Sequence, residues 1–462
     1  MAFDLCRKFL TLCALIFTST LCLKQDPPKV LLISFDGFRW DYIYKVPTPS
    51  FHKIIDDGVY VKQVTNIFIT KTYPNHYSMV TGLYAENHGV VANEMYDPVL
   101  NKTFSMDKMD IYQPEFWEEA SPIWITNQYE GHKSGAAMWP GTDVNIHGAY
   151  PSFYMPYNES VSFEDRVAQL IEWFTAKEPI NLGLLYWEEP DEMGHAVGPD
   201  NPLMGDTIVD IDTKLGYLVL ELKKAGLWDT MNIIITSDHG MEQCSSERVI
   251  ELDNYVDKDL YTLVDHSPVV AIFPNEGKLD EVYKALANIH PNMSVYKKEN
   301  IPDRFHYTHN SRIQPILAVA DLGWTILQNR SDKYLEGDHG YDNTQPNMHP
   351  LLLAHGPAFK RNVTKEAMNS VDLYPLLCHL LDIQALPNNG SLSHVQDLLA
   401  STAVEHLSDS GKQESYASVI GVFLGSVLAF GFLLVLIKHL TRSQISTMEL
   451  AHPEITQPLL DA

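Results

Sequence analysis

The chain has 462 residues and a hydrophobic fraction of 45%, which excludes a disordered protein and allows one large domain or several smaller ones. Lysine and arginine total 33 against 59 aspartate and glutamate residues, so the formal net charge is −26. This charge argues against a protein that grips the backbone of a nucleic-acid polymer, and a phosphate substrate would need local cations.

The first 23 residues have the pattern of a secretory signal peptide. Arg7 and Lys8 precede an apolar run from Phe9 to Phe17, and small residues follow before a polar segment. The alternative is a membrane anchor, but this apolar run is short for one. We therefore expect residues 1–23 to be removed and residues 24–400 to form a globular ectodomain.

A second apolar segment, near the other end, predicts a transmembrane helix over residues 418–438. Val419 to Ile437 contains no charge, and at about 1.5 Å per residue it matches a hydrocarbon core of about 30 Å. Basic residues follow directly, so the tail, 439–462, is expected in the cytosol. Residues 401–417 are a polar stalk. We therefore expect a single-pass type I protein of the plasma membrane, and a secreted, shed form is also compatible.

Three further features bear on this topology. Small residues at four-residue intervals in the membrane segment weakly suggest dimerisation, at Gly421, Gly425 and Ala429. Six glycosylation sequons lie between the two apolar segments, at Asn101, Asn158, Asn292, Asn329, Asn362 and Asn389. Only Cys244 and Cys378 fall in the ectodomain, where they either pair or remain free and buried.

Three apolar runs predict strands buried on both faces of a parallel sheet, and each leads into acidic residues. The runs are Val30–Phe35 before Asp36, Leu182–Trp187 before Asp191 and His195, and Ile233–Thr236 before Asp238 and His239. Ligands of open α/β sheets bind beyond the carboxyl ends of the strands, so these side chains could share one site. Phe163–Lys177 and Thr207–Ala225 are plausible crossover helices. The fold class is therefore α/β.

With His339, these residues form a set of three carboxylates and three imidazoles. Each alone has an ordinary explanation, because Asp-Gly is a common turn and an Asp-x-x-x-His pair is a common surface contact on a helix. Together, mixed oxygen and nitrogen ligands suit zinc better than magnesium or calcium. Two zinc ions would clamp the attacking and leaving oxygens of a phosphoryl transfer. Thr72, before a Pro turn, is either a rigidly held hydroxyl or an ordinary N-cap.

Five ordered motifs resemble the ectonucleotide pyrophosphatase/phosphodiesterase family of the alkaline phosphatase superfamily. They are Val30–Trp40, Lys71–Tyr77 with Val80–Tyr84, Tyr186–Asp191, Thr236–Met241 and His339–Asn343. The resemblance spans nearly the whole ectodomain. It implies an alkaline-phosphatase-like, mostly parallel central sheet flanked by helices, in addition to the transmembrane helix. The Cys-rich and nuclease-like modules of larger relatives do not fit this short chain.

The resemblance also implies a role for each site residue. Thr72 is the nucleophile and a zinc ligand; Asp36, Asp238 and His239 hold the same zinc; and Asp191, His195 and His339 hold the second. Asn93 matches a residue that holds a phosphate oxygen, and Tyr157 matches one that faces the nucleobase. Tyr73 stands where many relatives have Phe along the nucleotide slot, and we expect its hydroxyl to narrow the nucleotide range unless it points to solvent.

The implied function is a cell-surface, zinc-dependent phosphodiesterase or pyrophosphatase that acts through a phosphothreonine intermediate. Its expected substrates are extracellular nucleotides or dinucleotides such as NAD or diadenosine polyphosphates. One alternative is a phospholipid or choline-ester phosphodiesterase. The other is a surface receptor or adhesion protein with a catalytically weak site, although all seven ligand and nucleophile positions hold competent residue types.

Overall fold

The computed structural model describes residues 26–106, 108–332 and 334–400, and four helical positions beyond them, Leu428, Gly431, Val435 and Lys438. The chain divides into two compact units, Met1–Ala400 and Ser401–Ala462. No helix among the described residues is long and apolar enough to cross a membrane. The predicted signal peptide, stalk and tail lie outside the described residues, as does the predicted transmembrane segment apart from those four positions.

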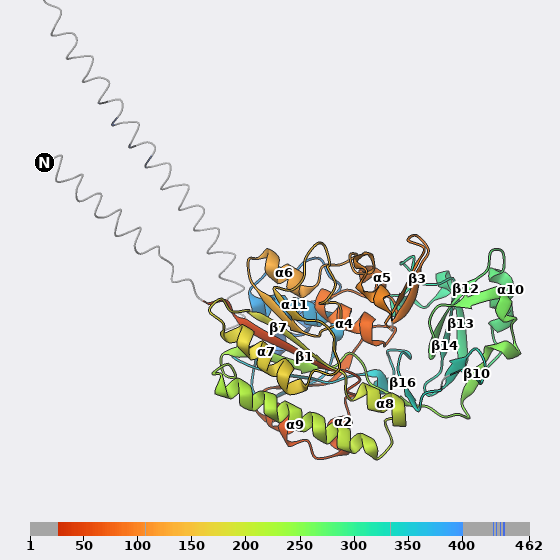
Figure 1. Ribbon diagram of the computed structural model, residues 1–462, viewed down its shortest axis with the longest axis horizontal. Helices are drawn as coiled ribbons and strands as arrows, with labels where there is room; N and C mark the ends of the chain where they lie inside the picture. Colours follow the sequence, from red (N-terminus) through yellow and green to blue (C-terminus); the bar gives the residue numbers. More distant parts are fainter. Residues whose placement is uncertain are drawn as a thin grey trace, which may run out of the picture. The chain divides into compact units, whose positions relative to one another are not determined.

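The first unit is built around an eight-stranded sheet in which only β17 runs antiparallel to its neighbours (Figure 1). The strands, in spatial order, are β18 (Val363–Asn369), β2 (Val59–Thr65), β17 (Leu352–His355), β8 (Met231–Thr236), β1 (Lys29–Phe35), β7 (Leu182–Trp187), β5 (Ser134–Ala137) and β6 (Phe153–Met155). The three strands predicted from apolar runs are β1, β7 and β8, and they are adjacent and parallel. The mostly parallel α/β fold is thus confirmed.

Helices cover both faces of this sheet (Figure 1). One face carries α3 (Pro49–Asp57), α7 (Phe163–Thr175) and α9 (Leu203–Lys224), and the other carries α4 (Thr72–Thr81), α6 (Ile123–Tyr129) and α11 (Leu373–Leu381). Successive side chains of β1 point to opposite faces of the sheet, which explains why helices cover both faces. Leu31, Ile33 and Phe35 join the core beneath α7 and α9. Ser34 faces the opposite way, toward α4.

The two predicted crossover helices are α7 and α9. Helix α7 begins after Ser162, whose Oγ accepts a hydrogen bond from the Asp165 N–H and so caps the first turn. Helix α9 buries residues three or four positions apart, from Met204 to Leu222, against the sheet. It begins four residues earlier than the apolar pattern predicts, at Leu203.

Strands β10–β15 and helix α10 form what we call the small lobe (Figure 1). Strands β11–β14 make an antiparallel sheet, and β10 pairs with β15 in a separate parallel ladder. The elements of the lobe are β10 (Val249–Glu251), β11 (Tyr261–Leu263), β12 (Val269–Pro274), α10 (Leu279–Leu286), β13 (Met293–Lys297), β14 (Ile316–Ala320) and β15 (Thr325–Leu327). It has its own apolar core, which includes Ile272, Val282 and Ile316. No apolar run or motif in the sequence predicted this lobe.

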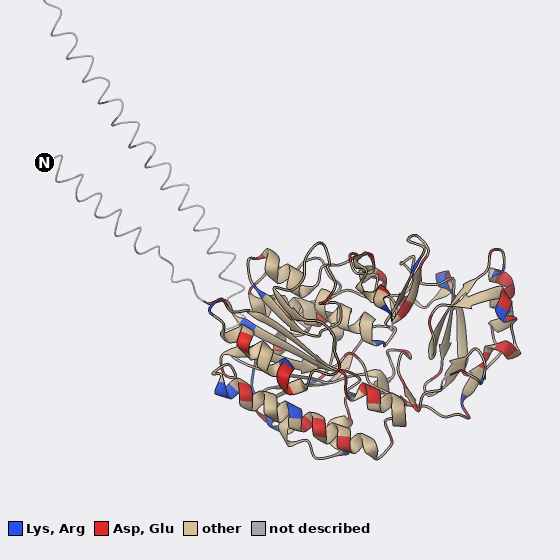
Figure 2. Cartoon of the chain, viewed as in Figure 1, with Lys and Arg blue, Asp and Glu red and all other residues tan. Residues whose placement is uncertain are grey.

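Short elements complete the first unit. They are α2 (Tyr42–Lys45), α5 (Ala85–His88), α8 (Asp191–Val197), the hairpin of β3 (Glu94–Asp97) and β4 (Lys102–Ser105), and the ladder of β9 (Glu242–Gln243) and β16 (Gly337–Asp338). Acidic residues lie along α8, α9 and α10 (Figure 2). Helix α8 and strand β16 matter most here, because they carry or adjoin predicted ligands.

The two ectodomain cysteines are both free and buried. Burial raises the pKa of the Cys244 and Cys378 thiols to about 12, so both remain protonated at neutral pH. Of the two alternatives left open by the sequence, the structure has the unpaired one. The sequons differ in exposure: Asn292 and Asn329 are partly buried, and the other four are exposed. Glycosylation at all six remains a prediction.

Candidate active site

The three predicted acids converge at the carboxyl edge of the sheet. Asp36 follows β1, Asp238 follows β8, and Asp191 begins α8 after β7; the Asp191 N–H donates to the Asp36 carbonyl at 3.1 Å. Gly37 makes this approach possible, because it has a φ of +67° and a Cβ there would lie 2.9 Å from atoms of Asp191. Its N–H also donates to Asp238 Oδ1 at 3.2 Å.

One group of metal-binding geometry contains Asp36, Asp238 and His239, all buried. His239 Nε2 lies 3.3 Å from Asp36 Oδ1 and 3.0 Å from Asp238 Oδ2. Thr72 Oγ1 lies 3.3 Å from the same nitrogen. The hydroxyl predicted as nucleophile is therefore beside the first predicted ligand set.

The second predicted set is also assembled. His195 Nε2 lies 3.3 Å from Asp191 Oδ2 and 3.1 Å from His339 Nε2, and His339 Nε2 lies 3.5 Å from Asp191 Oδ1. Asp191 and His195 share one face of α8, as their spacing predicted. His239 adjoins this set too: with Asp191 and His339 it forms a second group of metal-binding geometry, and its ring stacks on that of His339.

The three histidines are oriented in the same way. The Nδ1 of each donates to a backbone carbonyl: His195 to Gly337 at 2.9 Å, His239 to Gly240 at 2.9 Å and His339 to Thr70 at 2.8 Å. A histidine whose Nδ1–H is held in this way presents Nε2 as the ligand atom. All three Nε2 atoms point to the carboxylates.

Several carboxylate oxygens at this site are buried without a hydrogen-bond partner in the part of the chain that the structure describes. They are Asp36 Oδ1, Asp191 Oδ1 and Asp238 Oδ2, and imidazole nitrogens approach them at 3.0 to 3.5 Å. A buried charged oxygen is costly unless it meets a cation or a donor. The donor set and its unpartnered oxygens thus fit metal ions.

The pKa values describe how the site carries its charge without a metal. Burial raises the pKa of Asp36, and the nearby charges of Asp238 and Asp191 raise it further. Burial alone would lower the pKa of His195, but the Asp191 carboxylate outweighs it and raises the value to about 9. A proton on His195 therefore offsets part of the negative charge, and a metal ion at this position has to displace that proton.

Thr72 is the first residue of α4, and Lys71 is the N-cap, so the interpretation of Thr72 as an N-cap is wrong. Asn93, which precedes β3, lies at the same helix start. Its Oδ1 accepts a hydrogen bond from the Tyr73 N–H at 3.0 Å, while its Nδ2 has no partner among the described residues. A side-chain amide whose oxygen already accepts a hydrogen bond can donate from its nitrogen to a phosphate oxygen.

The roles of Tyr73 and Tyr157 beside a nucleobase stay predictions, and the structure gives the surroundings of both rings. The ring of Tyr73 packs edge-on against Phe104 and Trp117, with centroids 5.7 and 5.9 Å away. Tyr157 is 46% exposed, and its ring centroid lies 6.5 Å from that of Tyr186. Burial raises the pKa of Tyr73, so its hydroxyl stays protonated.

Two residues that touch the ligands were not assigned from the sequence. His76 is fully buried; its Nδ1 lies 3.3 Å from Asp238 Oδ2, and its Nε2 lies 2.9 Å from Ser34 Oγ. The Tyr186 hydroxyl donates to Asp36 Oδ2 at 2.5 Å. The four-residue spacing from Thr72 to His76 was a usable signal, whereas the contact of Tyr186 required the register of β1 and β7.

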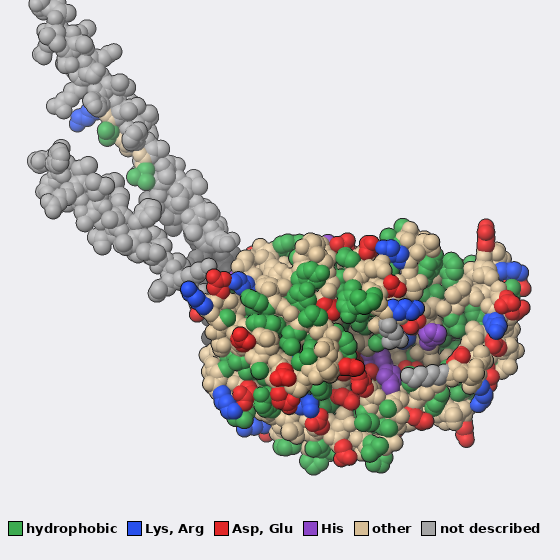
Figure 3. All heavy atoms as spheres, viewed as in Figure 1, with side chains coloured by type: hydrophobic (Ala, Val, Ile, Leu, Met, Phe, Trp, Pro, Cys, Tyr) green, Lys and Arg blue, Asp and Glu red, His purple; other side chains and the backbone are tan. Residues whose placement is uncertain are grey.

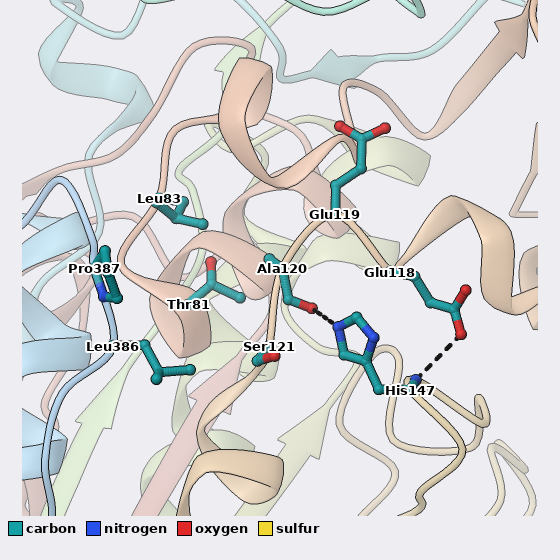
Figure 4. Close-up of a pocket in the computed structure, with 9 residues that line it drawn as sticks. All are labelled: Thr81, Leu83, Glu118, Glu119, Ala120, Ser121, His147, Leu386 and Pro387. Carbon is teal, nitrogen blue, oxygen red and sulfur yellow. Dashed lines mark hydrogen bonds between the residues drawn. The ribbon is translucent and has the colours of Figure 1, made fainter.

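Two concave regions can be compared on this unit. Histidine side chains gather beside a hollow on the face shown in Figure 3. A separate cavity of about 350 Å³ lies at the far end of α4, beside Thr81, Glu118 and His147 (Figure 4). The start and end of α4 are about 15 Å apart along the helix axis, so this cavity does not include the acid and histidine cluster.

The chain is similar to a known family of phosphodiesterases over most of its length. Residues 30–342 match the family described as type I phosphodiesterase/nucleotide pyrophosphatase. The chain is 64% identical to human ectonucleotide pyrophosphatase/phosphodiesterase family member 5 over 98% of both chains. It is 50% identical to human bis(5'-adenosyl)-triphosphatase ENPP4, over 89% of this chain and 88% of that one. A solved structure of murine ectonucleotide pyrophosphatase/phosphodiesterase 5, inactive (T72A) and in complex with AMP, matches with a TM-score of 0.80 at 70% identity, covering 81% of this chain and all of that one.

Proposed function

The chain belongs to the type I phosphodiesterase/nucleotide pyrophosphatase family and is a hydrolase, and on that premise we propose a zinc-dependent, cell-surface enzyme that cleaves extracellular nucleotides or dinucleotides. The observation that carries the proposal is the position of Thr72. Its hydroxyl lies 3.3 Å from His239 Nε2, at the junction of two groups with metal-binding geometry.

Zinc is the metal that this donor set favours, because buried imidazole nitrogens accompany the carboxylates. Asp36, Asp238, His239 and Thr72 would hold one ion, and Asp191, His195 and His339 the other. When bound, zinc supplies Lewis-acid chemistry, which lowers the pKa of a hydroxyl ligand and neutralises charge on phosphate oxygens.

The residues of the chain supply the covalent step. Thr72 Oγ1 forms a bond to phosphorus as the bond to the leaving oxygen breaks, and that oxygen departs with the electron pair while the hydroxyl proton passes to solvent. The product is a phosphothreonine ester that still carries the nucleoside. Water then cleaves this ester, which restores Thr72 and releases a nucleoside monophosphate.

Three residues would position the substrate. Asn93, held through its Oδ1 by the Tyr73 N–H, would donate from Nδ2 to an equatorial phosphate oxygen. Tyr73 and Tyr157 would flank the base. Two comparisons support a nucleotide substrate: the murine neighbour holds AMP in its inactive T72A form, and the similarity to a bis(5'-adenosyl)-triphosphatase favours dinucleotides such as diadenosine polyphosphates or NAD.

The cellular setting rests on the sequence. The apolar segments and sequons favour a type I protein of the plasma membrane with its catalytic unit outside the cell. The net charge of −26 disfavours a nucleic-acid polymer as substrate.

Turnover measured on a substrate panel tests the proposal. The protein is assayed with NAD, ATP, a diadenosine polyphosphate and a lysophospholipid, with a chelator and after zinc is added back. We expect release of a nucleoside monophosphate that the chelator abolishes and zinc restores, and a mass increase on the Thr72 peptide in acid-quenched samples. Hydrolysis of the lysophospholipid alone would favour the phospholipid alternative, and no metal-dependent turnover would favour the receptor.

A further inference from the structure

Lys71, directly before the proposed nucleophile, is a buried cation whose ammonium group pairs with a residue of the small lobe. Its side chain is 8% exposed, and its Nζ donates to Asp265 Oδ1 at 2.9 Å, to Asp265 Oδ2 at 3.0 Å and to the His266 carbonyl at 3.1 Å. All three ammonium protons therefore have acceptors. These acceptors belong to the small lobe, in the loop between β11 and β12.

The aliphatic part of Lys71 also touches the segment that carries His339. Gly340 has a φ of +119°, and a Cβ there would lie 3.1 Å from Lys71 Cε and 3.0 Å from Pro268 Cδ. Gly340 is thus held between the lysine stem and the same small-lobe loop. A larger residue would push the two apart, so the close packing depends on glycine.

Thr70 ties these segments together on the other side. Its carbonyl accepts from His339 Nδ1 at 2.8 Å, and its Oγ1 accepts from the Gly340 N–H at 2.9 Å. The chain at residues 70–72 and the chain at residues 339–341 therefore form one packed assembly. The ion pair of Lys71 with Asp265 connects the Thr70–Thr72 side of this assembly to the small lobe, while Tyr341 connects the other side, because its hydroxyl donates to the Trp324 carbonyl at 3.0 Å.

We propose that Lys71 is a positioning residue, which, through its buried ion pair with Asp265, holds Thr72 and His339 in place relative to each other. Asp265 is itself positioned, because its Oδ1 accepts from the His266 N–H at 2.9 Å. The small lobe supplies no predicted ligand, and this contact gives it a part in catalysis. The inference rests on the proposed function only for its kinetic consequence.

A second contact from the same loop provides a comparison. His266 Nε2 lies 3.6 Å from Glu94 Oε2, but the His266 side chain is 69% exposed, so this pair is screened by solvent. Lys71 and Asp265 are almost completely buried, and removing one partner would leave the other charge unpaired in the interior. Positioning is therefore assigned to the buried pair alone.

Kinetics of Lys71→Met in the full-length, zinc-loaded protein test the inference. We expect kcat to fall about 100-fold, because a displacement of about 1 Å at a reacting group has that effect. KM should change less than about threefold, since the base-contacting residues are untouched. Lys71→Arg, which keeps the charge and can still meet Asp265, should recover most of the lost kcat. A folded Lys71→Met protein with the kcat of the wild type would overturn the proposal.

Three further variants separate positioning from stability. Lys71→Met with Asp265→Leu removes both charges, so it should fold where the single variant is unstable, yet kcat should stay low. Lys297→Met breaks the ion pair with Asp280 inside the small lobe and should leave kcat unchanged, as should Glu94→Gln. Recovery of full kcat in the double variant would show that the pair is merely structural.

Amide hydrogen exchange gives a readout that does not depend on turnover. In Lys71→Met, residues 70–72 and 339–341 should both exchange faster, whereas Lys297→Met should leave them unchanged. If the wild type lacks metal-dependent turnover, the proposed function fails and exchange alone decides the positioning role. If the wild type is active and exchange in both segments is unchanged, the positioning role fails by itself.

Discussion

The two ends of helix α4 are equally buried but differ in how their polar groups are satisfied. At the start, Thr72 faces His239, and nearby oxygens of Asp36 and Asp238 have no hydrogen-bond partner within the described residues. In the second half of the helix, the Tyr77 hydroxyl donates to the Trp117 carbonyl at 2.6 Å, and Thr81 Oγ1 at the end donates to the Tyr77 carbonyl at 2.7 Å.

This difference shows which feature of a protein interior indicates chemistry. The cavity of about 350 Å³ lies at the satisfied end of α4, where hydroxyls and carbonyls already pair with each other. The start of the helix carries buried charges that the protein alone leaves incompletely paired. Unpaired charge in the interior is costly and persists where a ligand completes it, so we expect the start of α4 to be the functional end.

Replacing the two threonines of α4 one at a time should give the largest contrast. Thr72→Ala should lower kcat on a dinucleotide by about 10³-fold or more, because the nucleophile is lost. Thr81→Ala removes one backbone hydrogen bond, which costs about 1 kcal/mol of stability, and should leave kcat unchanged. Steady-state kinetics and thermal melts measure both. Similar kcat values for the two variants would abolish the proposed distinction.

Metal removal should destabilise the protein through the start of α4. A zinc ion present at about 1,000 times its Kd stabilises the folded state by about 4 kcal/mol, so a chelator should lower the melting temperature by several degrees. Calorimetry with and without chelator measures this. In the metal-free state, Asp36→Asn should melt higher than the wild type, because it relieves repulsion from Asp238 and Asp191. An unchanged melting temperature on chelation would contradict the assignment.

Two fully buried histidines, His76 in the middle of α4 and His88 at the end of α5, should differ in their effect on metal affinity. His76→Leu removes the imidazole beside Asp238 and should weaken zinc binding about 10- to 100-fold, as the loss of an outer contact to a ligand does. His88, which packs edge-on against Tyr77, is the matched control, and His88→Leu should leave affinity unchanged. Titration against a competing chelator measures both. Equal affinities would show that His76 has only a packing role.

Acid should destabilise the protein through His88. Burial lowers the pKa of His88 to about 3, whereas an unfolded histidine has a pKa of about 6.5. As the pH falls from 7 to 5, this histidine takes up a proton in the unfolded chain but not in the folded protein. The free energy of unfolding therefore falls by about 2 kcal/mol. Urea unfolding at both pH values measures this. In His88→Leu, the free energy of unfolding should fall by about 2 kcal/mol less between pH 7 and pH 5 than in the wild type. An equal fall in the two proteins would refute the explanation.

The smallest expected effect is on nucleotide preference. Tyr73→Phe removes one hydroxyl from the first turn of α4 and keeps the ring contacts with Phe104 and Trp117. Relative kcat/KM values across a nucleotide panel should shift by about threefold to tenfold toward a broader range, as the loss of one polar contact allows. An identical profile for the two proteins would show that the hydroxyl points to solvent.

Much of the site could be predicted because its residues follow a rule of the fold. Strands buried on both faces have to be continuous apolar runs, so β1, β7 and β8 were visible as such. Ligands of a parallel sheet bind beyond the carboxyl ends of its strands, so residues that follow those strands are expected to lie close together. This rule predicted the proximity of Asp36, Asp191 and Asp238. The helical spacing of Asp191 and His195 was equally clear.

Other parts depended on pairings that no local pattern contains. The strands of the small lobe are short and lead into no recognisable motif, so that lobe was not predicted. His76 was visible as a position on α4, but its contact with Asp238 follows from the packing of α4 on the sheet. The two cysteines were predicted to lie in an oxidising space, where they either pair or stay free, and the structure has them free and buried.

The sequence by itself determined the family, the fold class, and the identity of the nucleophile and ligand candidates, because apolar periodicity and ordered motifs are local properties. Tertiary structure alone decided that Thr72 starts α4 without capping it, that His239 adjoins both metal-binding groups, and that Lys71 reaches Asp265 across 194 positions of the chain. Contacts of this kind depend on how distant segments pack, and packing depends on the whole folded chain.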